Sequence, residues 1–289
     1  MEVAVNRNRE VHDSRWMNKI ATVLDRRYKN RNERKTSMRT FVSLVCAACV
    51  LGLNSFATMA QESKEPQQAK SFKGRISKDL SAEYLLHLPK DYSSRSRKRW
   101  PLMLFLHGAG ERGSDISKVA VHGPPKLVKQ GKDFPFIIVS PQCPNGRLWD
   151  NDVLFALLDE ATKKYNVDKS RVYLTGLSMG GYGTWSLGLT HPERFAAIAP
   201  ICGGGDPIAL LLADPKKTAA TKSLGVWAFH GAKDPVVKVE ESQRMVEALK
   251  KFGCKDVELT VYPEAQHDSW TETYNNPKLY EWFLEHRRK

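Results

Sequence analysis

The sequence predicts an α/β protein with a mostly parallel central sheet and helices on both faces. Short apolar runs recur along its second part, and longer segments with apolar residues at helical spacing separate them. Several runs end in loops rich in glycine and polar residues. Alternating strands and helices require right-handed crossovers, which give parallel strands. In such sheets the functional residues gather in the loops beyond the carboxyl ends of the strands.

Six apolar runs are the predicted strands, because each is too short for a helix and suits a strand that is buried on both faces. They are residues 101–106, 134–140, 171–175, 195–200, 225–229 and 257–262. Residues 152–165 and 239–252 have apolar residues at helical spacing and are predicted helices with core faces. Residues 203–224, between the fourth and fifth strands, are too few for a large cap domain.

The part of the chain before residue 73 is predicted to lie outside the folded domain of residues 73–289. Residues 41–53 are mostly apolar, follow Arg39 and precede the small residues 57–60, so residues 38–60 are a predicted signal peptide. A bilayer span needs about 20 residues, so this run is short for an anchor, and a buried core helix is the alternative. Residues 1–37 are a basic extension, either a long leader or the product of a start site placed too far upstream. Residues 61–72 are a polar linker.

The signal peptide predicts export, with the mature chain in the periplasm or outside the cell and without a stable membrane anchor. Cleavage is expected after Ala60. Of the five cysteines, Cys143, Cys202 and Cys254 would remain in the mature chain. Export permits one disulfide among them, but three thiols cannot all pair, and the sequence leaves the pairing open.

The formal charge of +13 does not indicate a nucleic-acid partner, because residues 1–37 carry a net charge of +5 outside the predicted fold. The remaining basic residues form no stripe interleaved with aromatic residues, so a solvated basic surface is expected. No His/Cys group has metal-ligand spacing, and no metal or cofactor is predicted. The sequence gives no indication of oligomeric state.

A nucleophile motif follows the predicted strand 171–175. Residues 176–180 read GLSMG and lead through more small residues into a helical stretch, which places Ser178 at the apex of a sharp turn between strand and helix. The glycines suit a strained turn in which the chain passes close to itself. Ser178 is therefore the candidate nucleophile.

A serine hydroxyl is a weak nucleophile until a base takes its proton, and the base needs a carboxylate to orient it. Asp234 lies in the turn after the predicted strand 225–229, and His267 lies in the loop after strand 257–262. Three loops thus present serine, acid and base in the chain order that this type of site uses. We expect His267 to be the general base and Asp234 the acid.

Other aspartate and histidine residues lie at comparable positions in the sequence. Asp206 also follows a strand and is the alternative acid, although it comes before the expected strand. His107 and His230 precede glycines at strand ends and are expected to hold loops by hydrogen bonds. His286 lies in a basic chain end and is expected to be solvated.

Acyl transfer at a serine also needs backbone N–H groups for the oxyanion of the tetrahedral intermediate. The N–H of Met179 starts the helix after the nucleophile. A second donor is expected from the glycine-rich loop after strand 101–106, with Ala109 first and Gly108 or Gly110 as alternatives; a plain glycine turn is the other interpretation. The loop lacks the Lys-Ser/Thr ending of a phosphate-binding loop.

Five segments resemble a known family, the bacterial predicted-peptidase or esterase branch of the α/β-hydrolases. This branch is close to phospholipase/carboxylesterases, dienelactone-hydrolase-like esterases and polyhydroxybutyrate-depolymerase-like esterases. The resemblance covers residues 75–287, and the segments are HGAGERG, GLSMGGYGTW, APICGGGDP, WAFHGAKDPVV and HDSWTETYNNP.

The resemblance implies the α/β-hydrolase fold and places nucleophile, acid and base on Ser178, Asp234 and His267. It implies hydrolysis of carboxylic esters through an acyl-enzyme. Members of the group have been labelled peptidases, feruloyl esterases and carboxylesterases, so the substrate stays open.

Two alternatives remain: a serine peptidase with the same residues, and an inert relative that binds carbohydrate or a partner. Without a large cap the cleft should admit small-molecule esters or bulky esters linked to polysaccharide. Trp149 and Trp270 are candidate substrate-stacking residues, and packing in the core or at the rim is the alternative for both.

Overall fold

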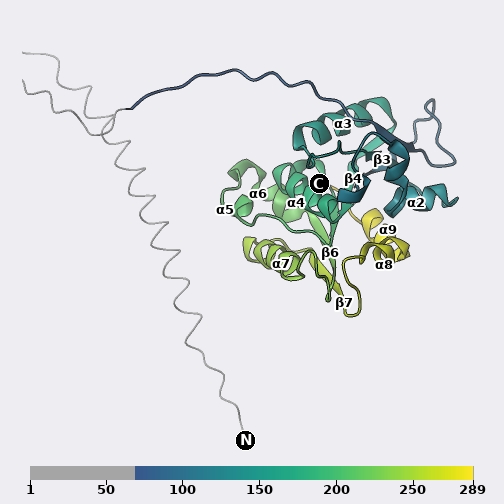
Figure 1. Cartoon of the computed structure of the whole chain (residues 1–289). Coiled ribbons are helices and arrows are strands. Elements are labelled where there is room, and N and C mark those ends of the chain that lie inside the picture. The colour runs from purple at the N-terminus through teal and green to yellow at the C-terminus, as the bar shows by residue number, and fades with distance from the viewer. Residues whose placement is uncertain (1–68, 289) are drawn as a thin grey trace, which may run out of the picture. The chain divides into compact units, whose positions relative to one another are not determined.

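The computed structural model describes residues 69–288 (Figure 1). The chain divides into a unit of Met1–Lys73 and a unit of Gly74–Lys289, and we describe the second by itself. The basic extension, the signal segment 38–60 and most of the linker 61–72 lie outside the described residues. Within residues 69–288, no helix combines the length and the apolar character that a bilayer span requires.

A seven-stranded sheet runs through the centre of the second unit in the order β1-β3-β2-β4-β5-β6-β7. β1 pairs antiparallel with β3, and every other pairing is parallel. The predicted α/β class with a mostly parallel sheet is therefore confirmed. The strands are β1 (Tyr84–His87), β2 (Trp100–Leu106), β3 (Ile137–Pro141), β4 (Val167–Leu177), β5 (Ala197–Ile201), β6 (Gly225–Gly231) and β7 (Val257–Tyr262).

Helices cover both faces of the sheet, as Figure 1 shows for α7 on one side of β6 and β7 and for α8 and α9 on the other. Successive side chains of a strand point to opposite faces, so Leu104 of β2 belongs to one apolar core and Phe105 to the other. The first core also contains residues of α3 (Asn151–Lys164), α4 (Met179–Thr190) and α7 (Glu240–Phe252). The second contains residues of α8 (Trp270–Asn275) and α9 (Pro277–Glu285), and α2 (Gly123–Lys129) packs against it.

The connection between β5 and β6 contains short elements and no large cap. These are α5 (Ile208–Leu211), the 3₁₀-helix η5 (Pro215–Lys217) and α6 (Thr218–Ser223). The other 3₁₀-helices of the described chain are η2 (Ala109–Glu111), η3 (Ile116–Ala120) and η4 (Pro192–Arg194). An open approach to the carboxyl ends of the strands follows.

The structure corrects several boundaries. β4 begins at Val167, four residues before the predicted start, and Val167 pairs with Trp100 across a shift in register. β3 begins at Ile137, because the buried Phe134 and Phe136 flank Pro135, whose ring lacks an N–H for the ladder. β1 was not predicted, since it has four residues, lies at the sheet edge and is only partly buried.

The prediction that His286 is solvated is wrong. Its side chain is only 16% exposed, and its Nε2 lies 2.5 Å from Asp256 Oδ2. Its Nδ1 lies 2.7 Å from the carbonyl of Trp282, one turn earlier in α9. An ideal Cβ on Gly225 would meet the His286 ring at 2.4 Å, so the imidazole packs directly on the start of β6 and ties the chain end to the sheet.

Candidate active site

Ser178 lies in the sharp turn between β4 and α4, with φ 52° and ψ −116°. This positive φ is unfavourable for a residue with a side chain and costs on the order of 1–3 kcal/mol. The surrounding backbone stabilises it, because the Ser178 N–H donates to the carbonyl of Ile201 at 2.9 Å. The turn thereby projects a partly exposed hydroxyl beyond the carboxyl edge of the sheet.

The glycines on either side of Ser178 are required by close contact between backbones. An ideal Cβ on Gly180 would lie 2.0 Å from the carbonyl oxygen of Leu106, and one on Gly176 would lie 2.5 Å from the carbonyl oxygen of Gly180. Neither neighbour is a flexible side chain that could move away. These contacts explain the GLSMG pattern.

The structure brings Ser178, His267 and Asp234 into one hydrogen-bonded chain. His267 Nε2 lies 3.0 Å from Ser178 Oγ, and His267 Nδ1 lies 2.7 Å from Asp234 Oδ2. An ionised carboxylate only accepts hydrogen bonds, so Nδ1 of the neutral ring carries the proton and Nε2 is free to accept one from the serine. Asp234 follows β6 and His267 follows β7, so adjacent parallel strands deliver both groups to the same edge of the sheet.

Asp234 is 3% exposed and is held in one orientation. Its Oδ1 accepts the backbone N–H groups of Val236 at 2.8 Å and Val237 at 2.9 Å, which leaves Oδ2 for His267. Burial disfavours the charged form, but the hydrogen bonds from His267, Val237 and Val236 outweigh it, so the pKa of Asp234 lies below its ordinary value. The carboxylate is therefore charged at neutral pH.

The two strand-end histidines hold loops, as expected. His107 Nδ1 lies 2.6 Å from the carbonyl of Gly108, and its Nε2 accepts the N–H of Cys143 at 3.0 Å. His230 Nε2 donates to the carbonyl of Val237 at 2.9 Å. His230 Nε2 also lies 3.3 Å from Asp234 Oδ2. The sequence did not predict this contact, because the two residues are four apart in a turn, where such a spacing does not imply proximity as it does in a helix.

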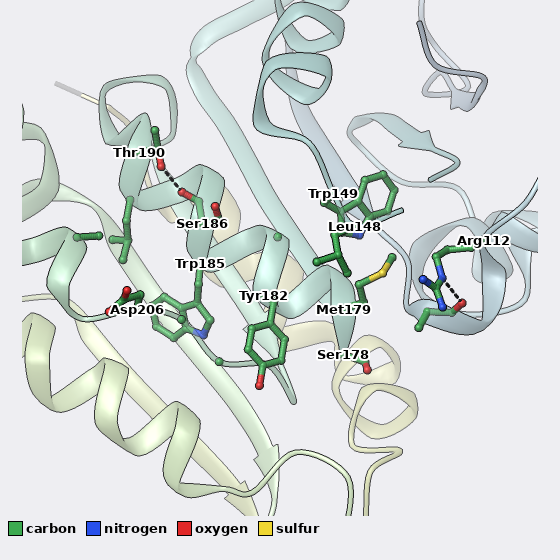
Figure 2. Close-up of a pocket in the computed structure, with 16 residues that line it drawn as sticks. Arg112, Leu148, Trp149, Ser178, Met179, Tyr182, Trp185, Ser186, Thr190 and Asp206 are labelled. Atoms are coloured by element: carbon green, nitrogen blue, oxygen red, sulfur yellow. Dashed lines mark hydrogen bonds between the residues drawn. The ribbon is translucent and has the colours of Figure 1, made fainter. Parts of the chain in front are cut away.

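A cavity of about 780 Å³ opens beside Ser178. Met179 and Ala109, the two candidate oxyanion donors, both line it, and so does Trp149. Figure 2 shows Ser178 and Met179 at one end, with Ser186 and Thr190 farther along the same helix. The cavity follows α4 away from the serine.

The other candidate residues do not take the roles considered for them. Trp270 does not line the cavity; its ring packs perpendicular to that of His267, with centroids 5.3 Å apart. Asp206 does line the cavity, but its Oδ1 accepts the N–H of Ile208 and it makes no bond to His267, whose Nδ1 contacts Asp234. Gly108 and Gly110 are absent from the cavity wall.

Tyr182, which the sequence did not single out, lies on the wall one helical turn beyond Ser178.

The three cysteines of the described chain are free and buried. Burial raises the pKa of Cys202 to about 12 and that of Cys254 to about 11, and it also raises the pKa of Cys143. Within residues 69–288, no cluster of three or more His, Cys, Asp or Glu residues is arranged to hold a metal ion.

We expect Cys143, Cys202 and Cys254 to resist alkylation in the native protein, because the thiolate is the reactive form and a buried, high-pKa thiol rarely ionises. Peptide mapping by mass spectrometry after iodoacetamide treatment, with and without guanidinium, measures this. Each should be modified only after unfolding. A disulfide-linked peptide, or rapid modification of the native protein, would contradict the structure.

Comparison with known proteins adds a family match to part of the chain. Residues 151–278 match the phospholipase/carboxylesterase family. Acyl-protein thioesterase 1 of Mycosarcoma maydis is 34% identical over 37% of this chain and 45% of its own length. Probable feruloyl esterase C of Aspergillus terreus is 24% identical over 61% of this chain and 64% of its own length. The chain thus spans less than two thirds of these curated relatives.

Solved structures agree with the observed topology. A thermostable esterase has a TM-score of 0.56 and 35% identity, covering 71% of this chain and 59% of its own. Acyl-protein thioesterase 2 of Zea mays has a TM-score of 0.54 at 14% identity, covering 71% of this chain and 99% of its own, which bears on the fold alone. The bacterial branch stays a prediction. The sheet, the turn at Ser178 and these matches together show that the chain has the α/β-hydrolase fold.

Proposed function

We propose that this protein is a serine esterase that hydrolyses carboxylic esters through an acyl-enzyme. The hydrogen-bonded chain from Ser178 through His267 to Asp234, at the mouth of a cavity, carries the proposal. Similarity to esterases supports the same class of reaction.

In the proposed reaction, Ser178 Oγ attacks the ester carbonyl carbon while His267 Nε2 takes the hydroxyl proton. The imidazolium that forms is stabilised by Asp234. His267 then gives the proton to the departing alcohol, which leaves an acyl group on Ser178. Water, activated by the same histidine, attacks the acyl group, releases the carboxylic acid and restores the serine.

The negative charge on the carbonyl oxygen would be held by backbone N–H groups of Met179 and Ala109. Met179 is the first residue of α4, where N–H groups have no partner within the helix and the helix dipole favours negative charge. Ala109 is the first residue of η2 and also lines the cavity. A donor of this kind contributes about 3 kcal/mol to transition-state stabilisation.

The substrate class that we propose is an ester with a bulky acyl or alcohol part, such as an acyl or feruloyl group on a polysaccharide. The absence of a large cap in the described chain and the size of the cavity favour it. Trp149 is the candidate stacking residue, because it lines the cavity, whereas Trp270 does not. Relatives named as feruloyl and acetylxylan esterases are consistent with this class.

We further propose that the protein is exported through the segment 38–60.

A fluorophosphonate probe is expected to label the protein at Ser178, and short p-nitrophenyl esters should be hydrolysed much faster than matched p-nitroanilides. The probe reacts only with an activated serine, and the ester leaving group needs less help from the acid than an amine does. Tryptic mapping locates the label, and initial rates on both substrate series measure the preference. Equal rates on anilides would favour a peptidase, and an unlabelled, folded protein would favour an inert binding relative.

A further inference from the structure

A second histidine–carboxylate pair lies beside the proposed base. Glu111 in η2 and His122, just before α2, approach with His122 Nε2 3.8 Å from Glu111 Oε1. The other ring nitrogen, His122 Nδ1, lies 3.3 Å from the indole Nε1 of Trp270. Trp270 in turn packs at 90° to the ring of His267, with centroids 5.3 Å apart. The four side chains form a continuous series from a buried carboxylate to the base.

The hydrogen bond between Trp270 and His122 determines which nitrogen of the neutral His122 ring carries the proton. An indole N–H only donates, so His122 Nδ1 must accept the hydrogen bond from Trp270. The proton of the neutral ring is then on Nε2, which faces the Glu111 carboxylate. The Glu111 carboxylate, 3.8 Å away, attracts this N–H and so favours the tautomer that can accept the indole N–H.

Glu111 is a buried acidic side chain that the proposed reaction leaves unused. It is 9% exposed, and its Oε2 has no hydrogen-bond partner. Among residues 69–288, the basic side chains within 4 Å of its carboxylate are His122 and His107, the latter 3.9 Å from Oε2. A buried carboxylate in such surroundings has a cost in stability, which a functional site can tolerate.

Trp270 acts on His267 from outside the hydrogen-bonded chain. Both nitrogens of His267 are hydrogen-bonded, Nε2 to Ser178 and Nδ1 to Asp234. The motion that remains to the ring is rotation about the line that joins these two nitrogens. A perpendicular aromatic ring packed against the imidazole limits this rotation.

We propose that Glu111 and His122 form a positioning pair that holds Trp270 against His267 and thereby keeps the base aligned for proton transfer. The inference rests on the proposed function of His267. It also gives Trp270 a role other than stacking on the substrate. Because Glu111 and Ala109 belong to the same 3₁₀-turn, the pair links the base to the loop of the proposed oxyanion donor.

The test compares His122→Leu, His122→Gln, Trp270→Phe and the double variant His122→Leu/Trp270→Phe with the parent enzyme on p-nitrophenyl acetate. Leucine removes the acceptor, glutamine retains one, and phenylalanine keeps a ring but removes the N–H. We expect His122→Leu and Trp270→Phe each to lower kcat about tenfold with KM unchanged, since small misalignment of a catalytic group is costly. The double variant should be no worse than either single one, because both remove the same bond. His122→Gln should recover most of kcat.

A matched control is His191→Leu. His191 also pairs with a glutamate, its Nδ1 lying 3.3 Å from Glu193 Oε1. It follows the last residue of α4, about 20 Å along the helix from Ser178. This variant should keep the parent kcat.

The labelling rate of Ser178 by a fluorophosphonate, measured on the same variants, separates failure of this inference from failure of the proposed function. Absence of label in the parent enzyme would refute the serine mechanism itself. Normal labelling of the parent together with parent-like kcat in Trp270→Phe would overturn the positioning role. A rise in KM at constant kcat would also overturn it and assign the residues to substrate binding. If His122→Leu fails to fold, Trp270→Phe decides, because Trp270 is only partly buried and phenylalanine keeps an aromatic ring there.

Discussion

Replacement of Ser178 by alanine is expected to reduce kcat on a p-nitrophenyl ester by about 10⁶-fold, which is the scale on which removal of a serine nucleophile acts in enzymes of this mechanism. The change removes the one oxygen that His267 Nε2 contacts at 3.0 Å and leaves the cavity wall otherwise intact. Residual turnover should reflect only binding and the oxyanion donors. Initial rates at saturating substrate, with active-site titration of the parent, measure the loss.

The control is Ser223→Ala at the end of α6, an exposed serine whose hydroxyl donates to the carbonyl of Ala220. It should keep parent activity. Circular dichroism and Tm should be the same for Ser178→Ala and the parent within a few degrees, because alanine has to adopt the same positive φ as serine did. A folded Ser178→Ala protein that keeps more than a few per cent of its activity would refute the assignment of the nucleophile.

Much of the site was predictable because its signals are local in the chain. The turn at Ser178 needs glycines at positions where a Cβ would lie within 3 Å of other backbone atoms, and the GLSMG pattern shows this requirement directly. Asp234 and His267 each follow a run of apolar residues whose ends the sequence locates to within two residues. The carboxyl ends of parallel strands lie at the same edge of the sheet, so residues that follow different strands in the sequence come close together in space.

The contacts of aromatic side chains were not predictable in the same way. Trp149 and Trp270 both follow strands. Nothing in the neighbouring sequence indicates that Trp149 lines the cavity whereas Trp270 packs against His267. The difference comes from His122, nearly 150 residues before Trp270 in the chain, whose ring nitrogen takes the indole N–H. His286 was misread for a similar reason. Its basic neighbours suggest solvent, whereas its contacts are with Asp256 and the start of β6.

The strand limits show where local pattern fails. The segment 167–170 is polar, yet β4 includes it because Val167 pairs with Trp100 of the neighbouring strand. Conversely, Phe134 is almost fully buried but precedes β3, since burial by α9 residues such as Tyr280 requires no strand. Pairing and packing partners decide these cases, and neither is encoded in a window of adjacent residues.

Replacement of Asp234 by asparagine is expected to lower kcat by about 10⁴-fold with little change in KM, the magnitude known for this substitution in serine enzymes with the same three groups. The structure gives a reason specific to this site. Oδ1 accepts two backbone N–H groups, from Val236 and Val237, so the oxygen of the asparagine amide must stay there. The NH₂ group then faces His267 Nδ1, which has to accept a hydrogen bond. The ring proton moves to Nε2, and the base can no longer take the proton of Ser178.

The same substitution tests the pKa of Asp234 through stability. The pKa of this carboxyl is lower in the folded protein than its ordinary value, so ionised Asp234 stabilises the fold above the unfolded-state pKa of about 3.9. That contribution is lost as the pH falls through the folded-state pKa. Urea unfolding should therefore show the parent to be more stable than Asp234→Asn at pH 7, with a difference that shrinks as the pH is lowered below about 4. A constant difference would show that ionisation of Asp234 is not linked to folding.

Two further asparagine variants make the kinetic result specific. Asp214→Asn changes a carboxylate that accepts a backbone N–H, that of Lys216, at the start of η5, and it should leave kcat unchanged. Asp206→Asn changes the alternative acid, which makes no bond to His267, and any loss should be far smaller than that of Asp234→Asn. A large loss of kcat in Asp206→Asn with a mild effect in Asp234→Asn would reverse the assignment of the acid. It would also require a different arrangement of His267 from the one in which Nδ1 lies 2.7 Å from Asp234.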